Sequence, residues 1–162
     1  TRNPQELQAA KEALIKQKPL VLAYVGDDVK DKMIAGEAAL AVVWSGDAVF
    51  MQWENEDLAY VVPEEGSNLW FDAMVIPATS KHQKEAELFI NFMCDPEIAF
   101  KNTDYIGYST PHTEAYKMLD PELANDKTAY PDETDLVNCE VFDDLSDFIA
   151  EYDRIWTEVK AY

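Results

Sequence analysis

The stretch Trp70-Phe71-Asp72 places an aromatic side chain two residues from a carboxylate, just before the short apolar run 73–76. In an extended chain, residues i and i+2 point to the same side, so Trp70 and Asp72 can line one wall of a cleft together. An indole face attracts an organic cation, and a carboxylate accepts its hydrogen bonds. The pattern predicts a site for an alkylammonium group, although a tryptophan ahead of a strand is also typical of a protein core.

The charge of the chain narrows the class of partner. The 162 residues include 32 Asp and Glu against 13 Lys and Arg, which gives a net charge of −19 at pH 7. This negative field repels nucleic-acid phosphates and anionic lipid surfaces, and it attracts cations. We therefore expect no nucleic-acid partner, while most individual carboxylates are expected to form a solvated coat.

Motifs for catalysis and for cofactors are missing from the sequence. It has no nucleophile elbow, dinucleotide fingerprint, phosphate loop, zinc-protease motif or calcium loop. The two histidines, His82 and His112, lie far apart, and Cys94 and Cys139 lack the spacing of a metal or redox motif. We expect no enzyme, no cofactor and no metal site. The start at Thr1-Arg2-Asn3 predicts a cut inside a longer protein.

Alternating helix and strand patterns predict an α/β fold with a mixed sheet flanked by helices. Cap residues, prolines and apolar periodicity predict helices near 4–17, 28–34, 48–54, 83–93, 96–104 and 121–124, with the clearest one at 145–159. Apolar runs predict strands at 20–24, 39–44, 58–63 and 73–76. The run 39–44 brings Trp44 to a carboxyl edge of the sheet, where open α/β sheets bind their ligands.

Six segments, in order and covering most of the chain from residue 25, together resemble one family. They are MIAGEAAL at 33–40, VWSGDA at 43–48, LWFDAMVIP at 69–77, INFMCDPEIA at 90–99, IGYSTP at 106–111 and PELANDKTAYP at 121–131. This set is similar to the C-terminal half of the spermidine/putrescine-binding proteins, the substrate-binding components of bacterial polyamine ABC importers.

The resemblance implies a periplasmic-binding-protein-like fold of type II, whose two lobes close on an elongated polycation. It further implies that residues 1–69 belong to the second lobe, that 70–111 cross over and pack on the first lobe, and that 112–162 return to the second lobe. The N-terminal lobe is then absent from the chain, and the two-lobed fold is incomplete. The apolar stripe with Phe89, Phe92 and Met93 would be left uncovered, which predicts a dimer or a domain swap.

The resemblance also implies the binding residues. Trp44 and Trp70 resemble the aromatic walls along the ligand's methylene chain, Asp72 the carboxylate that takes an amine, and Tyr108 the aromatic hydroxyl of the Gly-Tyr crossing. Two positions depart from the family pattern. Ser109 stands where the family often has a proline. Phe142 stands near the position at which the family has a polar side chain that reaches the ligand, so the preferred polyamine is left open.

The implied function is an extracytoplasmic solute-binding protein, periplasmic or anchored at the outer face of the cytoplasmic membrane. It delivers polyamines to the transmembrane permease subunits of an ABC transporter. Two alternatives stay open from the residues themselves. The fragment acts as a structural or oligomerisation module without tight ligand binding, or the site serves another organic cation.

Overall fold

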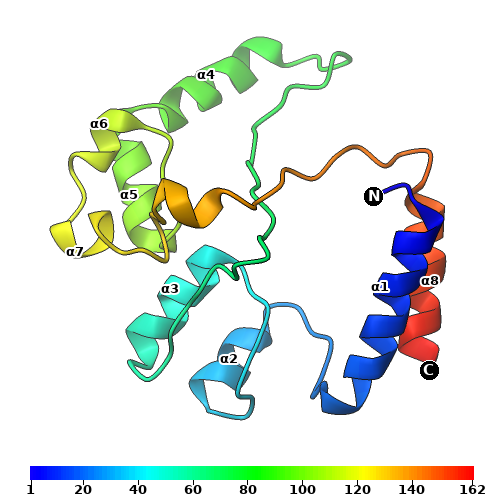
Figure 1. The fold of residues 1–162 in the computed structure, drawn as a ribbon. Coiled ribbons are helices and arrows are strands. Elements are labelled where there is room, and N and C mark those ends of the chain that lie inside the picture. Colours follow the sequence, from blue (N-terminus) through cyan, green and yellow to red (C-terminus); the bar gives the residue numbers. More distant parts are fainter. The chain divides into compact units, whose positions relative to one another are not determined.

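The computed structural model describes all of residues 1–162, and it consists of helices joined by long extended and irregular segments (Figure 1). The chain divides into two compact units. The first unit combines Thr1–Gly26 with Phe142–Tyr162, and the second unit is Asp27–Val141.

The first unit is a parallel pair of helices, α1 (Pro4–Gln17) and α8 (Ile149–Ala161), with a short 3₁₀ turn η1 (Lys18–Leu20) after α1. Leu7 of α1 packs with Ile155 and Val159 of α8, and Val159 is fully buried. Because an amphipathic helix is stable when its apolar stripe is covered, each helix supplies the cover that the other needs.

Local signals at the start of α1 act as the sequence predicts. The Asn3 side chain accepts a hydrogen bond from the Gln5 amide, and Pro4 takes the first helical position. At the other end of the pair, the Lys18 ammonium donates to the carbonyl of Val159 at 2.9 Å. A cation at a helix C-terminus satisfies carbonyl groups that have no helical partner.

The second unit contains the remaining helices, and those predicted from caps and periodicity are confirmed. They are α2 (Val29–Ile34), α3 (Ser45–Glu54), α4 (Gln83–Met93), α5 (Pro96–Ile106), α6 (Thr113–Tyr116), α7 (Pro121–Ala124) and the 3₁₀ turn η2 (Glu133–Leu136). Two predictions need correction. Helix α3 begins at Ser45 rather than Ala48, and α6 and η2 lie in segments where no helix was predicted.

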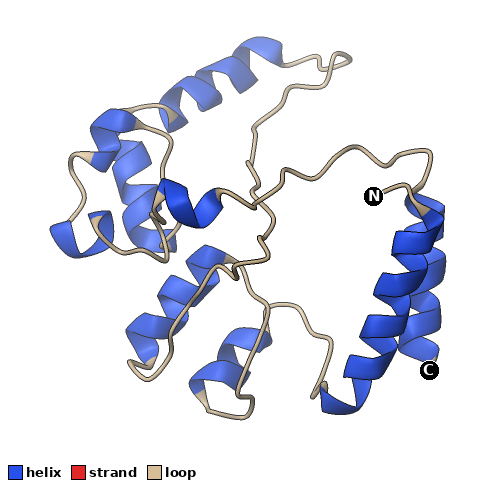
Figure 2. Cartoon of the chain, in the orientation of Figure 1, coloured by secondary structure: helices blue, strands red, loops and turns tan.

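The predicted mixed sheet is not confirmed, because the runs 20–24, 39–44, 58–63 and 73–76 form no strands (Figure 2). The β-type pairing in the chain is one isolated parallel bridge between Asn68 and Glu140. A strand is stabilised by ladder hydrogen bonds to a neighbour and by burial of its apolar side chains. These runs have no ladder hydrogen bonds to a neighbouring strand. Their apolar side chains are not buried either, since Leu40, Val61 and Val75 are all largely exposed.

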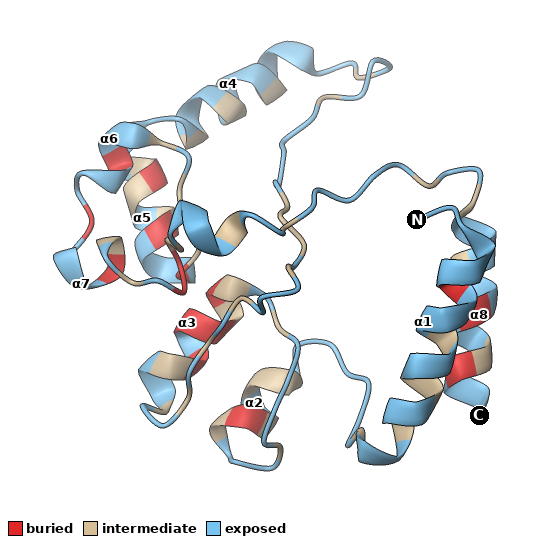
Figure 3. Cartoon of the chain, viewed as in Figure 1, coloured by how far each residue is buried: buried red, intermediate tan, exposed pale blue.

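Helix α3 contributes to both apolar clusters of the second unit. Figure 3 shows buried stretches along this helix. On one side, Val49 packs with Leu119, Leu123 and Ala129. On another, its Ala48 and Met51 pack with Met33 of α2. Burial on both sides fixes the position of α3, and therefore of the residues at its start.

Candidate functional site

The start of α3 positions the first predicted site residue. Trp44 is the N-cap residue and has an extended backbone, with φ −74° and ψ 149°, and the helix begins at the next residue. Its side chain is 53% exposed. Gly46 and Asp47 follow in the first helical turn. Because the two apolar clusters fix the position of α3, they also fix the backbone of Trp44, Gly46 and Asp47 at its start.

The end of α5 docks Tyr108 against this turn. Gly107 ends α5 in the left-handed conformation, with φ 72°, and its amide donates to the Thr103 carbonyl. The half-buried ring of Tyr108 lies directly on Gly46, since a Cβ built at Gly46 would meet Tyr108 Cδ2 at 2.1 Å. Glycine is therefore required at position 46 by the close approach of the ring, which no larger residue permits.

Trp70 is held by the isolated bridge. The Leu69 amide donates to the Glu140 carbonyl at 2.9 Å, and the Glu140 amide donates to the Ser67 carbonyl at 3.0 Å. The bridge joins segments that are distant in sequence, and it fixes the backbone immediately before Trp70.

Three of the four predicted site residues contact one another. The Trp44 and Trp70 ring centroids lie 5.4 Å apart at 76°, and those of Trp70 and Tyr108 lie 5.5 Å apart at 73°. Both are edge-to-face contacts, the arrangement that aromatic quadrupoles favour. We call Trp44, Trp70 and Tyr108 the aromatic row. Its members come from three segments that are brought together by α3, the end of α5 and the bridge at residue 68.

Carboxylates border the aromatic row. The pKa of Tyr108 is raised to about 12, chiefly by burial and also by the negative charges of Asp47, Asp72 and Asp27, while a hydrogen bond from the Asp47 backbone amide opposes the shift. Asp72, the fourth predicted residue, lies in an exposed segment close enough for its charge to act on the phenol. Aromatic faces beside carboxylates can bind a cation with an apolar stem, by cation–π attraction, apolar contact and charge-assisted hydrogen bonds.

Sequence reasoning missed two charged residues near the row. The Asp47 carboxylate, 18% exposed, is 3.5 Å from the Lys30 ammonium, and Lys30 is also 3.8 Å from Asp27. The available signal was the spacing of Asp47 from Trp44, which puts both at the first turn of one helix. A helix start at Ala48, as the sequence predicts, leaves Asp47 outside that turn.

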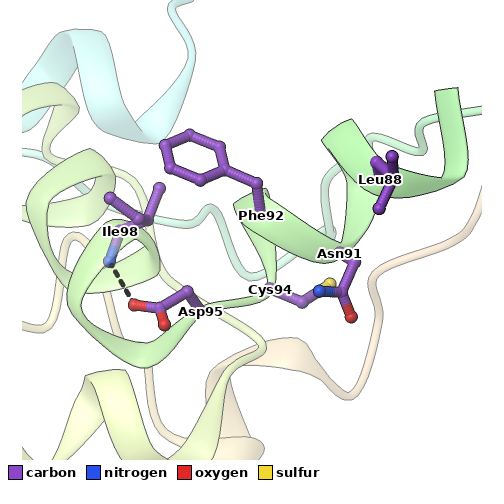
Figure 4. Close-up of a pocket in the computed structure, with 6 residues that line it drawn as sticks. All are labelled: Leu88, Asn91, Phe92, Cys94, Asp95 and Ile98. Atoms are coloured by element: carbon purple, nitrogen blue, oxygen red, sulfur yellow. Dashed lines mark hydrogen bonds between the residues drawn. The ribbon is translucent and has the colours of Figure 1, made fainter. Parts of the chain in front are cut away.

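A separate depression of about 530 Å³ lies between α4 and the start of α5, as Figure 4 shows. It is lined by Leu88, Asn91, Phe92, Cys94, Asp95 and Ile98. None of the predicted site residues lies there. The Asp95 carboxylate already accepts hydrogen bonds from the Glu97 and Ile98 amides as the cap of α5. Both hydrogen bonds reach the same carboxylate oxygen of Asp95, so the depression combines apolar side chains with a carboxylate that also caps a helix.

No three or more His, Cys, Asp or Glu side chains are grouped so as to hold a metal ion. The two cysteines are not paired with each other. None of the helices combines the length and the apolar character that crossing a membrane requires.

A family model described as "Bacterial extracellular solute-binding protein" matches residues 1–131. The chain is similar to the spermidine/putrescine-binding periplasmic protein of Salmonella typhimurium, with 37% identity over 161 residues. It is 35% identical to the protein of the same name from Escherichia coli K12. Each alignment covers 99% of this chain and 46% of the relative. The chain thus spans about half the length of these curated relatives.

Solved structures of spermidine/putrescine ABC transporter proteins are also similar to this chain over about half of their length. A putative spermidine/putrescine ABC transporter protein from Listeria monocytogenes aligns with a TM-score of 0.92 and 45% identity, covering 99% of this chain and 50% of its own. A spermidine/putrescine ABC transporter substrate-binding protein from Streptococcus pneumoniae aligns with a TM-score of 0.83 and 42% identity, covering all of this chain and 50% of its own. The backbone therefore follows the fold of substrate-binding proteins along its whole length.

Proposed function

The chain belongs to the bacterial extracellular solute-binding protein family, and from that premise we propose that it binds polyamines of the spermidine and putrescine type for an ABC importer. The observation that carries the proposal is the aromatic row with carboxylates at its border. Several relatives that match over nearly the whole chain are named for binding these two compounds.

The chemistry of the ligand fits these residues. A polyamine consists of ammonium groups joined by methylene chains, so it needs apolar faces and negative charges in alternation. We assign the methylene chain to Trp44 and Trp70, an ammonium group to Asp72, and a hydrogen bond to the Tyr108 hydroxyl. The phenol of Tyr108 is neutral at physiological pH and can donate this hydrogen bond.

The proposed architecture is a type II binding protein in which residues 1–69 and 112–162 belong to the second lobe and 70–111 pack on the first. The unpaired extended runs, such as 39–44 and 73–76, are then strands of a mixed sheet whose partners lie outside residues 1–162. This explains why apolar residues such as Leu40 and Val75 are exposed in the chain by itself. The protein would act outside the cytoplasm, with permease subunits as partners.

Helix α4 favours a second candidate role. Leu88, Phe89 and Phe92 on this helix are each more than half exposed, which is unusual for large apolar side chains on one helix. We propose that a protein surface covers them, either the first lobe or, in the isolated chain, a second copy through a dimer or domain swap. Size-exclusion chromatography tests this: a monomer with residues 73–104 protected from hydrogen exchange contradicts the swap.

Calorimetric titration of the complete gene product tests the binding function. We expect spermidine or putrescine to bind, and Trp70→Ala and Asp72→Ala each to weaken binding by about tenfold or more, because each removes a ligand-facing group. Asp153→Ala is the matched control, since it removes an exposed carboxylate from α8 in the other unit. Unchanged affinity in both site variants contradicts the proposed site. Binding of choline in place of polyamines indicates that the ligand is another organic cation.

A further inference from the structure

Lys30 places an ammonium group against Asp47, in the helical turn that follows Trp44. It lies on α2 and is 28% exposed, and its Nζ is 3.5 Å from Asp47 Oδ1 and 3.8 Å from Asp27 Oδ1. Asp27 is almost fully exposed, whereas Asp47 is only 18% exposed, so Asp47 is the partner that solvent screens less. The pair joins α2 to the first turn of α3.

Asp47 is part of the surroundings of the row. It follows Gly46, on which the Tyr108 ring lies, and it stands in the first turn after Trp44. Its negative charge is also the strongest charge effect on the Tyr108 phenol. The helix N-terminus favours an ionised carboxylate at this position, so Asp47 would attract a cation if Lys30 did not already pair with it.

The Lys30 side chain is chemically similar to one end of a polyamine, because both are a primary ammonium on a methylene chain. We propose that Lys30 is a specificity-determining residue, an internal ammonium that neutralises Asp47 and leaves Asp72 as the carboxylate open to the ligand. This inference rests on the proposed function. With Asp47 neutralised, the site has one fewer acceptor for an additional ammonium group. The relative affinity of the protein for a diamine and a triamine therefore depends on Lys30.

Calorimetry on the complete gene product at fixed ionic strength tests the proposal, with putrescine as the diamine and spermidine as the triamine. In Lys30→Met, we expect the spermidine Kd to fall about tenfold, because one more charge-assisted hydrogen bond becomes available. The putrescine Kd is expected to change less, so the ratio of the two constants shifts by at least about threefold. Lys30→Arg keeps the positive charge and should leave the ratio unchanged.

Two further variants separate Asp47 from a general charge effect. Lys32→Met removes a cation from the same helix, where Lys32 pairs with Glu37 at 3.0 Å, and should leave the ratio unchanged. Lys30→Met with Asp47→Asn should return the ratio to that of the wild type. Circular dichroism establishes that each variant is folded before titration.

The outcomes distinguish the two proposals. Wild-type binding with an unchanged ratio in Lys30→Met overturns this inference alone, as does an equal shift in Lys32→Met. Absence of polyamine binding to the wild type overturns both the proposed function and this inference. A shift confined to Lys30→Met and reversed by Asp47→Asn supports the specificity role.

Discussion

Two groups of aromatic side chains in the second unit, each with an exposed member, differ in what surrounds them. Trp44 of the aromatic row is 53% exposed, and Phe89 and Phe92 of α4 are 58% and 52% exposed. The row is assembled from three separate segments and is bordered by Asp47 and Asp72. The α4 face comes from one helix, and its one aromatic contact is Phe89 with Phe92 at 6.4 Å.

The difference shows that exposure of an aromatic side chain does not by itself define a ligand site. Convergence of several segments, with charges of one sign around the rings, is typical of recognition of a small cation. A stripe of apolar side chains along one amphipathic helix is typical of a surface that another protein surface covers.

Gly46→Ala should disrupt the row most strongly, because the new Cβ would overlap the Tyr108 ring. We expect a loss of about 1–3 kcal/mol in the free energy of unfolding, typical of overpacking, and at least a tenfold rise in the polyamine Kd. Chemical denaturation and calorimetry measure the two effects. In a Tyr108→Ala background the stability loss should nearly vanish, and equal losses in both backgrounds contradict the assigned contact.

Trp44→Ala should weaken polyamine binding by about three- to tenfold, because it removes one face available for cation–π and methylene contact. Trp44→Phe keeps a smaller ring and should recover part of the affinity. Titration calorimetry measures both variants. Identical affinities for wild type and Trp44→Ala would place the ligand away from the row.

Tyr108 should make stability depend on alkaline pH. Burial raises its pKa to about 12 in the folded protein, against about 10 when unfolded, so the folded state retains a proton that the unfolded state loses. Stability is therefore full below pH 10 and declines as the pH rises from about 10 to 12, by less than about 1.4 kcal/mol per pH unit because solvent screens the exposed edge of the ring. Denaturation of Tyr108→Phe across this range should show a shallower decline, and an identical decline contradicts the shift.

The α4 face should matter least for the ligand. Phe89→Ser with Phe92→Ser in the complete gene product is expected to change the polyamine Kd by less than about twofold. The same double variant should lower the melting temperature by roughly 5 °C or more, because it removes apolar area that another surface covers. Unchanged melting together with a large loss of affinity would reverse the roles of the two aromatic groups.

Local signals in the sequence determine much of the helical structure. Asn3-Pro4 and Asp95-Pro96 each mark a helix start through a side chain and a ring within one turn, and both helices begin where predicted. The run 39–44 has an equally strong strand pattern, yet it pairs with nothing in the chain. A helix makes its hydrogen bonds within one segment, whereas a strand depends on a neighbour that its own sequence does not specify.

The candidate site likewise has features that can be predicted from the sequence and features that cannot. Trp70 and Asp72 are identifiable from their spacing and Trp44 from its place after an apolar run, whereas Tyr108 is assigned through the family resemblance. The roles of all four as ligand contacts stay predictions. The pairing of Lys30 with Asp47 and the contact of Tyr108 with Gly46 were not predictable. Both depend on how α2, α3 and the end of α5 pack, and no spacing within one segment encodes such packing.

The most direct test of the central claim is a crystal structure of the complete gene product with spermidine bound. The account predicts that the methylene chain lies against Trp44 and Trp70, with an ammonium nitrogen about 2.7–3.2 Å from an Asp72 carboxylate oxygen. A ligand bound away from these residues, or one whose ammonium groups all pair with other carboxylates, would contradict it.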